Sequence, residues 1–118
     1  MVNSAQAART NPAFAEAAPV FAALGDETRL RIVARLCREG PASISRLTEA
    51  AEVSRQAVTK HLRALEDAGL VRSGRAGREC IWELQTRRLA QVRRYLDQIS
   101  TQWDVTLERL RAFVERQE

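Results

Sequence analysis

Residues 43–71 decide the fold, and their sequence is SISRLTEAAEVSRQAVTKHLRALEDAGLV. Ser43 and Ser54 each precede apolar residues at helical spacing, and serine is a preferred residue at the N-terminus of a helix. We therefore expect a short helix after Ser43 and a longer one over about residues 55–68, which Gly69 ends. The inward residues of the longer helix are expected at three- and four-residue spacing: Val58, Leu62 and Leu65. Two helices joined by a tight turn predict a helix-turn-helix.

Upstream of this motif, the sequence predicts one well-bounded helix and a less regular start. Asp26 is expected to cap the helix, and Gly40-Pro41 to end it. Its apolar stripe is expected to comprise Leu30, Ile32, Val33 and Leu36. Its arginines are interpreted as surface charge: Arg29, Arg31, Arg35 and Arg38. Because proline does not fit comfortably inside a helix, we expect only a turn of helix from Pro12 and a separate helix over about residues 19–24. Residues 1–11 are small and polar and predict a mobile tail.

Downstream of Gly69, the spacing of apolar residues changes from helical to alternating. Residues 70–75 and 78–84 alternate roughly around Gly74-Arg75-Ala76-Gly77, which predicts a β-hairpin with a basic tip. Three helices followed by a basic hairpin are typical of a winged helix-turn-helix. The expected fold class is therefore mostly α with a small β-hairpin, with the winged helix-turn-helix domain spanning residues 12–118.

The last segment, about residues 86–117, contains neither glycine nor proline and predicts a helix about 45 Å long. Its apolar residues form a coiled-coil-like seam with one extra step after Trp103. A helix of this length exceeds what so small a domain can cover. We therefore favour a dimer interface over a helix packed only on its own domain. The expected interface residues are Leu89, Val92, Leu96, Ile99, Trp103, Leu107 and Leu110.

Composition limits the class of protein. The chain has 118 residues, of which 45% are hydrophobic and 29% charged, and a net charge of +4. The hydrophobic fraction is too high for a disordered chain, and no apolar run approaches the ~20 residues of a membrane span, so we expect a soluble cytoplasmic protein without membrane partners. The sequence has no glycine-rich phosphate loop and no credible set of catalytic nucleophile and base. We therefore expect that the protein is not an enzyme and binds no cofactor.

The outward face of the helix over residues 55–68 carries side chains that donate hydrogen bonds, and none of them is acidic. They are Arg55, Gln56, Thr59, Lys60 and Arg63. Arginine and lysine suit guanine, glutamine suits adenine, and threonine suits a phosphate or the methyl group of thymine. The expected contacts with double-stranded DNA also include Ser54 and His61 on this helix, and Arg72, Arg75 and Arg78 on the hairpin. A winged-helix module that binds protein is the alternative, but it would favour an acidic or apolar face.

Three motifs together resemble one family. Residues 23–32, ALGDETRLRI, are similar to the opening A-L-x-D-x-T-R-L-R-I of ArsR/SmtB-type transcriptional regulators. Residues 53–62, VSRQAVTKHL, resemble the recognition helix of that family, and residues 65–71, LEDAGLV, its junction between helix and wing. The resemblance implies a homodimer that represses its own operon from a near-palindromic operator and leaves the DNA when an effector binds.

Departures from the family pattern bear on the effector. Metal-sensing members carry a C-x-C pair where this chain has Ser43 and Ser45, and the other familiar site needs histidines that its last helix lacks. Because hydroxyl groups are poor ligands for zinc or arsenite, we expect no metal site. The motif Trp103-Asp104-x-x-Leu107-x-x-Leu110 resembles a non-metal-sensing subgroup. Glu52 stands where the turn often has glycine, which leaves the shape of the turn open.

Two effector mechanisms stay open: a redox response of Cys37 and Cys80, or a small molecule in a pocket at the dimer interface. A free cysteine is usually a small buried apolar residue, and that is the interpretation we favour for both thiols.

Overall fold

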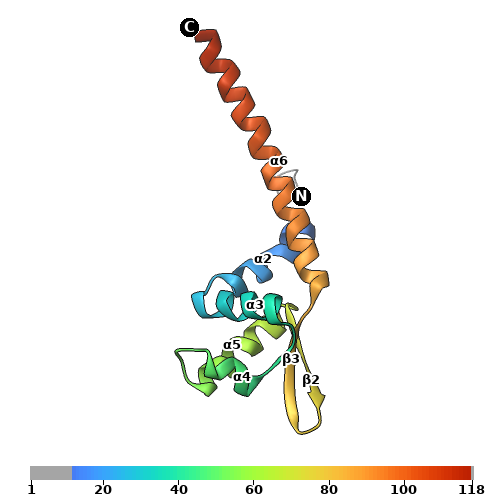
Figure 1. The fold of residues 1–118 in the computed structure, drawn as a ribbon. Coiled ribbons are helices and arrows are strands. Elements are labelled where there is room, and N and C mark those ends of the chain that lie inside the picture. The colour runs from blue at the N-terminus through green and yellow to red at the C-terminus, as the bar shows by residue number, and fades with distance from the viewer. Residues whose placement is uncertain (1–11, 118) are drawn as a thin grey trace, which may run out of the picture.

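The computed structural model describes residues 12–117, so the expected tail over residues 1–11 lies outside the described residues. The elements run in the order α2 (Pro12–Leu24), α3 (Glu27–Glu39), β1 (Ala42–Ser43), α4 (Ile44–Glu49), α5 (Arg55–Asp67), β2 (Val71–Ala76), β3 (Glu79–Leu84) and α6 (Thr86–Gln117). Figure 1 shows α2 to α5 gathered beside the β2–β3 hairpin, with α6 projecting away from them. This is the predicted winged helix-turn-helix with a long C-terminal helix.

Polar caps begin the helices where the sequence predicts. The carboxylate of Asp26 accepts from the backbone N–H of Arg29 (3.0 Å), and the hydroxyls of Ser43 and Ser54 accept from Arg46 N (3.2 Å) and Ala57 N (3.1 Å). Each cap satisfies one of the N–H groups that a helix leaves without an internal partner. The predicted starts of α3, α4 and α5 are confirmed.

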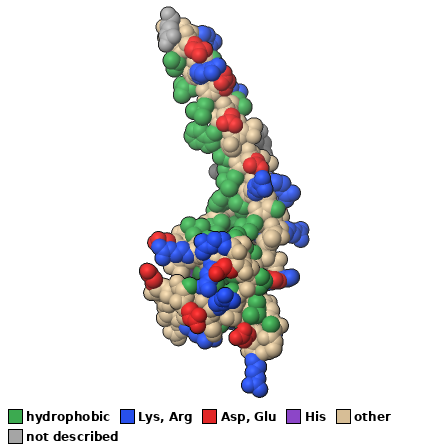
Figure 2. Space-filling view, viewed as in Figure 1, with side chains coloured by type: hydrophobic (Ala, Val, Ile, Leu, Met, Phe, Trp, Pro, Cys, Tyr) green, Lys and Arg blue, Asp and Glu red, His purple; other side chains and the backbone are tan. Residues whose placement is uncertain are grey.

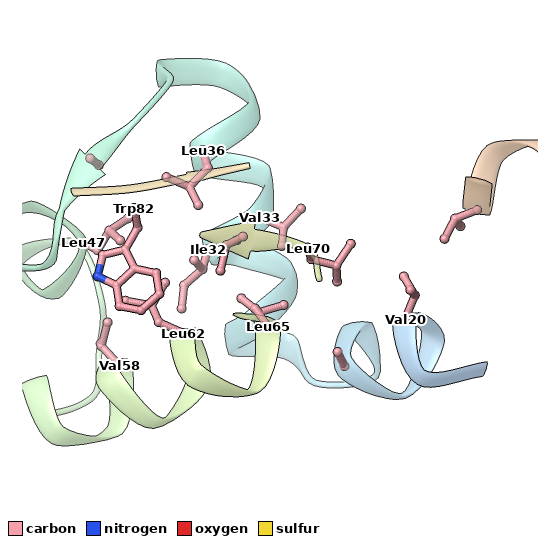
Figure 3. Packing of buried hydrophobic residues seen from close by; sticks show 14 residues of the cluster. Val20, Ile32, Val33, Leu36, Leu47, Val58, Leu62, Leu65, Leu70 and Trp82 are labelled. Atoms are coloured by element: carbon pink, nitrogen blue, oxygen red, sulfur yellow. The ribbon is translucent and has the colours of Figure 1, made fainter. Parts of the chain in front are cut away.

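The core lies between α3, α5 and the sheet (Figure 3). Val58, Leu62 and Leu65 of α5 have no exposed surface, and they pack with Ile32, Val33 and Leu36 of α3 and with Trp82 of β3. The predicted inward face of α5 is confirmed. On α3 the prediction was wrong for Leu30, which is 50% exposed, because an offset of two residues from Ile32 places it about 200° around the helix.

One expected break is absent. Helix α2 runs without interruption from Pro12 to Leu24, with Pro19 inside it, so the separate helix starting near Pro19 was wrong. Proline removes the bond to the carbonyl of Ala15, but Pro19 and Ala15 lie on the exposed side, where water can bind that carbonyl. The buried residues of α2 hold the helix on the domain: Ala17, Val20 and Ala23.

The sheet has three antiparallel strands in the order β1-β3-β2. Ala76 pairs with Glu79, so the hairpin turns at Gly77-Arg78, and the predicted turn around residues 74–77 was placed too early. Gly77 has a φ of 66°, a conformation that suits glycine in a two-residue turn. Strand β1 was not expected: Ala42 and Ser43 pair with Trp82 and Ile81.

Gly69 sets the junction between α5 and the wing. Its φ is 78°, and a Cβ placed there would lie 2.9 Å from Nε of Arg88. We expect Gly69→Ala to lower the free energy of unfolding by about 1–2 kcal/mol, because an L-residue is strained at positive φ. Denaturant unfolding measures the change. Gly74→Ala is the control, since a Cβ at Gly74 meets no atom within 4 Å. Equal losses in both variants would contradict the prediction.

Candidate nucleic-acid interface

Helix α5 presents one polar face to the solvent because the side chains on its opposite face are buried in the core. Arg55, Gln56, Lys60 and Arg63 are all exposed, and among residues 12–117 Arg55 and Lys60 form no ion pair. Nη1 of Arg63 lies 4.0 Å from Oε1 of Glu66, a weak surface pair that a phosphate can replace. Gln56, Lys60 and Arg63 therefore point away from the core, and Arg55 is exposed at the first residue of α5, so all four can reach a nucleic acid.

Two of the predicted contact residues also serve the helix itself. The hydroxyl of Thr59 donates to the carbonyl of Arg55 (2.9 Å), which leaves its methyl group and its acceptor capacity for a ligand. The hydroxyl oxygen of Ser54 accepts the capping bond from Ala57 N (3.1 Å), so its own hydrogen is still available. Their contact with DNA stays a prediction.

His61 does not lie on the outward face. It sits on the flank of α5 towards the start of α3, with its side chain 21% exposed. Its Nδ1 lies 3.2 Å from Nη1 of Arg29 and 3.7 Å from the carboxylate of Asp26. The backbone N–H of Arg29 is the main cause that holds the pKa of the Asp26 carboxyl below its ordinary range.

Arg29 is the residue that sequence reasoning missed. It was interpreted as surface charge, but it is half-buried and its Nε donates to the carbonyl of Ala23 (2.5 Å). The missed signal is its spacing: Arg29 precedes Val33 by four residues and Leu36 by seven, which places it on the buried face of α3. Arg35 is also half-buried and donates to the carbonyl of Arg46 (2.9 Å).

The predicted arginines of the wing, the β2–β3 hairpin, differ in whether they form an ion pair. Arg72 pairs with Glu83 on the neighbouring strand, whereas Arg75 and Arg78 form no ion pair within residues 12–117. Arg75 lies in β2 opposite Cys80, and Arg78 lies in the turn. Two unpaired guanidinium groups therefore lie at or near the turn of the hairpin.

The predicted interface residues of α6 fall into two groups. Val92 is buried in the core of its own domain and Leu89 packs against that core, so the first turns of α6 belong to the domain. Further along, Ile99 is half-buried, and Leu96, Trp103, Leu107 and Leu110 are 47–61% exposed; Figure 2 shows hydrophobic side chains along one side of the helix. This apolar stripe repeats every 11 residues through Val92, Trp103 and Val114, and the repeat keeps it on one side of a nearly straight helix.

Known proteins share this architecture. A helix-turn-helix domain family matches residues 24–74, which run from the end of α2 to Gly74 in β2. The ArsR-like transcriptional regulator from Rhodococcus sp. RHA1 superposes with a TM-score of 0.75 at 41% identity, over 87% of this chain and 96% of that chain. The HTH-type transcriptional regulator NmtR of Mycobacterium tuberculosis is 36% identical over 90 residues, which are 76% of this chain and 74% of that protein. The chain belongs to the ArsR family of transcriptional regulators.

Membership in the ArsR family identifies the chain as a DNA-binding transcriptional regulator with a winged helix-turn-helix. Another ArsR relative, the arsenic resistance regulator ArsR1 of Pseudomonas putida, is 35% identical over 55% of this chain and only 51% of its own length. The homodimeric winged helix-turn-helix domain of Mb0332 from Mycobacterium bovis shares the fold, with a TM-score of 0.62 at 21% identity over 86% of this chain and 89% of that one.

The side chains that commonly bind metal ions are dispersed in the described part of the chain. Within residues 12–117, no group of three or more His, Cys, Asp or Glu side chains lies close enough to hold a metal ion. Ser43, which stands at one position of the C-x-C pair of metal-sensing members, uses its hydroxyl as the cap of α4.

The described part of the chain contains no helix that is long and apolar enough to cross a membrane.

The two cysteines differ in environment. Cys80 is half-buried and packs against the core, whereas Cys37 is exposed, so the expectation of a buried thiol was wrong for Cys37. The reason is its position directly after the buried Leu36, about 100° around α3 and away from the core.

Glu52 lies in the turn between α4 and α5. Among the described residues every positive φ belongs to a glycine, so the turn accommodates Glu52 without a left-handed backbone conformation.

Proposed function

We propose that the chain is a homodimeric repressor of its own operon, which binds a near-palindromic operator and needs no metal ion. The observation that carries the proposal is the outward face of α5: Arg55, Gln56 and Lys60 are exposed, and the core fixes the opposite face. In the proposed cytoplasmic complex, this face of α5 enters the major groove of the DNA. The β2–β3 hairpin, which is the wing, lies along the flanking phosphate backbone.

Base reading and backbone binding are assigned to different residues. Arg55, Gln56 and Lys60 read or position bases, since their donors match the guanine and adenine edges. Arg63 and Ser54 are assigned to phosphate contacts, Thr59 to the methyl group of thymine, and His61 to positioning of the helix. On the wing, Arg75 and Arg78 hold the phosphate backbone, and Arg72 does so after exchanging its partner Glu83 for a phosphate.

Dimerisation is supported by the exposed part of α6. A stripe that contains Trp103 at 61% exposure and Leu110 at 57% is unusual on a monomer and typical of a surface that another chain covers. The homodimeric state of the structural neighbour Mb0332 supports the same assembly. Two α5 helices held in this way would enter successive major grooves about 34 Å apart.

Release from DNA is assigned to an effector that changes the contact between the two α6 helices. A hollow of about 140 Å³ lies between α2 and α6 and is lined by side chains such as Val20, Val92 and Tyr95. A small molecule bound there would contact Val92, where the apolar stripe of α6 begins. A small rotation of α6 at that point would move both α5 helices of the dimer. An oxidant acting on the exposed Cys37 is the other effector that the surface allows.

Fluorescence anisotropy tests the proposed function. The reduced, chelator-treated protein is titrated onto DNA from its own upstream region and onto a shuffled copy, over a range of salt concentrations. Tight, sequence-dependent and salt-sensitive binding supports a repressor that is active without metal. Equal and weak binding to both DNAs would overturn it.

The division between reading and backbone contacts gives a prediction. We expect Gln56→Ala to reduce the preference for upstream over shuffled DNA, and Arg75→Ala to weaken both complexes equally and to reduce the salt slope by about one. Anisotropy on both DNAs measures these effects. Arg38→Ala is the control for loss of charge, since Arg38 is exposed at the end of α3. If Gln56→Ala and Arg75→Ala cause the same loss on every DNA, the assignment is wrong.

A further inference from the structure

We infer that Arg29 and His61 form a bridge that fixes the rotation of α5 about its own axis, which makes Arg29 a positioning residue for sequence reading. The positioning role rests on the proposed function, whereas the bridge itself does not. Arg29 is a half-buried cation outside the face assigned to DNA.

The side chain of Arg29 connects three helices: it belongs to α3 and contacts α2 and α5. Its Nε donates to the carbonyl of Ala23 in the last turn of α2 (2.5 Å), and its Nη1 donates to Nδ1 of His61 on α5 (3.2 Å). The carbonyl groups in the last turn of a helix have no partner within that helix, so the first bond satisfies a group that α2 leaves open. The second bond reaches across to α5.

The bridge also fixes the proton on the imidazole. A guanidinium group has only donors, so Nδ1 of His61 must be the unprotonated acceptor, and Nε2 carries the hydrogen. The Asp26 carboxylate lies 3.7 Å from the same Nδ1, which is too far for a hydrogen bond. A protonated Nδ1 would direct its hydrogen at the guanidinium of Arg29.

His61 lies where a contact resists rotation of the helix. The buried residues Val58, Leu62 and Leu65 fix α5 along one line, and His61 lies roughly 70° to one side of that line. On the other side, Glu66 accepts from the hydroxyl of Ser73 in β2 (3.3 Å). Contacts with α3 on one flank and with β2 on the other hold α5 in a single orientation.

The orientation of α5 decides the positions of the side-chain tips on its outward face, which is the face assigned to base reading. A side-chain tip about 6 Å from the helix axis moves about 1 Å for every 10° of rotation. A shift of that size disturbs a bidentate contact with a base, which needs both donors in place. Contacts with phosphates tolerate it better, because they depend mainly on charge. Loss of the bridge should therefore reduce discrimination between sequences more than affinity for DNA in general.

A double-mutant cycle on the full-length protein tests the positioning role. Arg29→Met keeps the unbranched stem and removes the donors, and His61→Leu removes the acceptor. We expect each variant to lower the ratio of affinities for upstream and shuffled DNA by about tenfold, the effect of losing one hydrogen bond to a charged group. The double variant is expected to lose no more than either single one. His61→Asn, which offers an oxygen near the position of Nδ1, should recover most of the ratio.

Two results would overturn the positioning role. The first is multiplication of the single losses in the double variant, which would make the residues independent. The second is an equal loss on shuffled DNA together with a flatter salt slope, which would make either residue a direct phosphate contact. Thermal unfolding followed by circular dichroism checks that the variants fold, and His61→Leu together with its rescue by His61→Asn carries the test if Arg29→Met does not fold.

The bridge can be tested without DNA, because the chain contains a single histidine. A long-range ¹H–¹⁵N spectrum at a pH where the ring is neutral should show hydrogen on Nε2 only, and a resonance of Nδ1 that shifts in Arg29→Met. Hydrogen on Nδ1, or an unchanged Nδ1 resonance in Arg29→Met, would overturn the bridge. A wild-type protein that does not discriminate between the two DNAs would overturn the proposed function and the positioning role but not the bridge.

Discussion

Leu107→Asp is expected to convert the protein into a monomer and to lower its affinity for upstream DNA by at least about 100-fold. Leu107 is 56% exposed in the middle of the apolar stripe, so the substitution leaves the core of the domain unchanged. In the proposed dimer, each copy would place an unpaired carboxylate in an apolar contact, where burial of charge is strongly unfavourable. Two linked reading helices bind far more tightly than one, and the loss of the link removes that gain.

The control for this experiment lies two residues away. Val105 is 46% exposed but points to the opposite side of α6, so Val105→Asp introduces the same charge outside the stripe. We expect Val105→Asp to stay dimeric and to bind DNA like the wild type. Light scattering after size-exclusion chromatography measures the mass, and anisotropy measures the affinity. A dimeric Leu107→Asp, or two variants that behave alike, would exclude the stripe as the contact between copies.

Leu62→Ala is expected to lower the free energy of unfolding by about 3 kcal/mol. Leu62 has no exposed surface and lies at the centre of the contact between α5, α3 and the sheet. Removing a buried leucine side chain costs both the transfer free energy and the cavity left behind. Because the reading face is the opposite side of the same helix, the native fraction of Leu62→Ala should retain its DNA preference.

The matched control for Leu62→Ala is Leu30→Ala. The two substitutions are chemically identical, but Leu30 is 50% exposed on α3, so its loss should change the free energy of unfolding by less than about 0.5 kcal/mol. Denaturant unfolding at one protein concentration compares the two, since a dimer gains stability with concentration. Similar losses in both variants would mean that Leu30 is covered in solution.

The parts of the fold that depend on neighbouring residues could be predicted from the sequence. Asp26, Ser43 and Ser54 act as caps within three residues of their partners, and the inward face of α5 follows from spacing alone. The prediction at Pro19 was wrong because the sequence shows only the hydrogen bond that proline removes from a helix. Whether the helix tolerates that loss depends on the exposure of Pro19, which is set by the packing of α2.

The parts that depend on distant residues could not be predicted. Ala42 and Ser43 have little preference for strands, and they form β1 only because β3 offers partners far along the chain. The contact between Arg29 and His61 likewise joins residues that no local pattern links. The position of Arg29 on the buried face of α3 could be derived from its spacing, but its partner could not.

The middle position of β3 has a consequence for the geometry of the whole regulator. This strand is bonded to β1 on one edge and to β2 on the other, and one residue separates its end from the start of α6. The backbone N–H of that residue, Gln85, is itself tied to the carbonyl of Leu70 (2.8 Å). Lengthening the hairpin beyond Gly77-Arg78 would therefore alter only how far the wing reaches along the DNA in the proposed complex. An extra residue at Gln85 would instead turn α6 against its domain and, in the proposed dimer, change the distance between the two α5 helices.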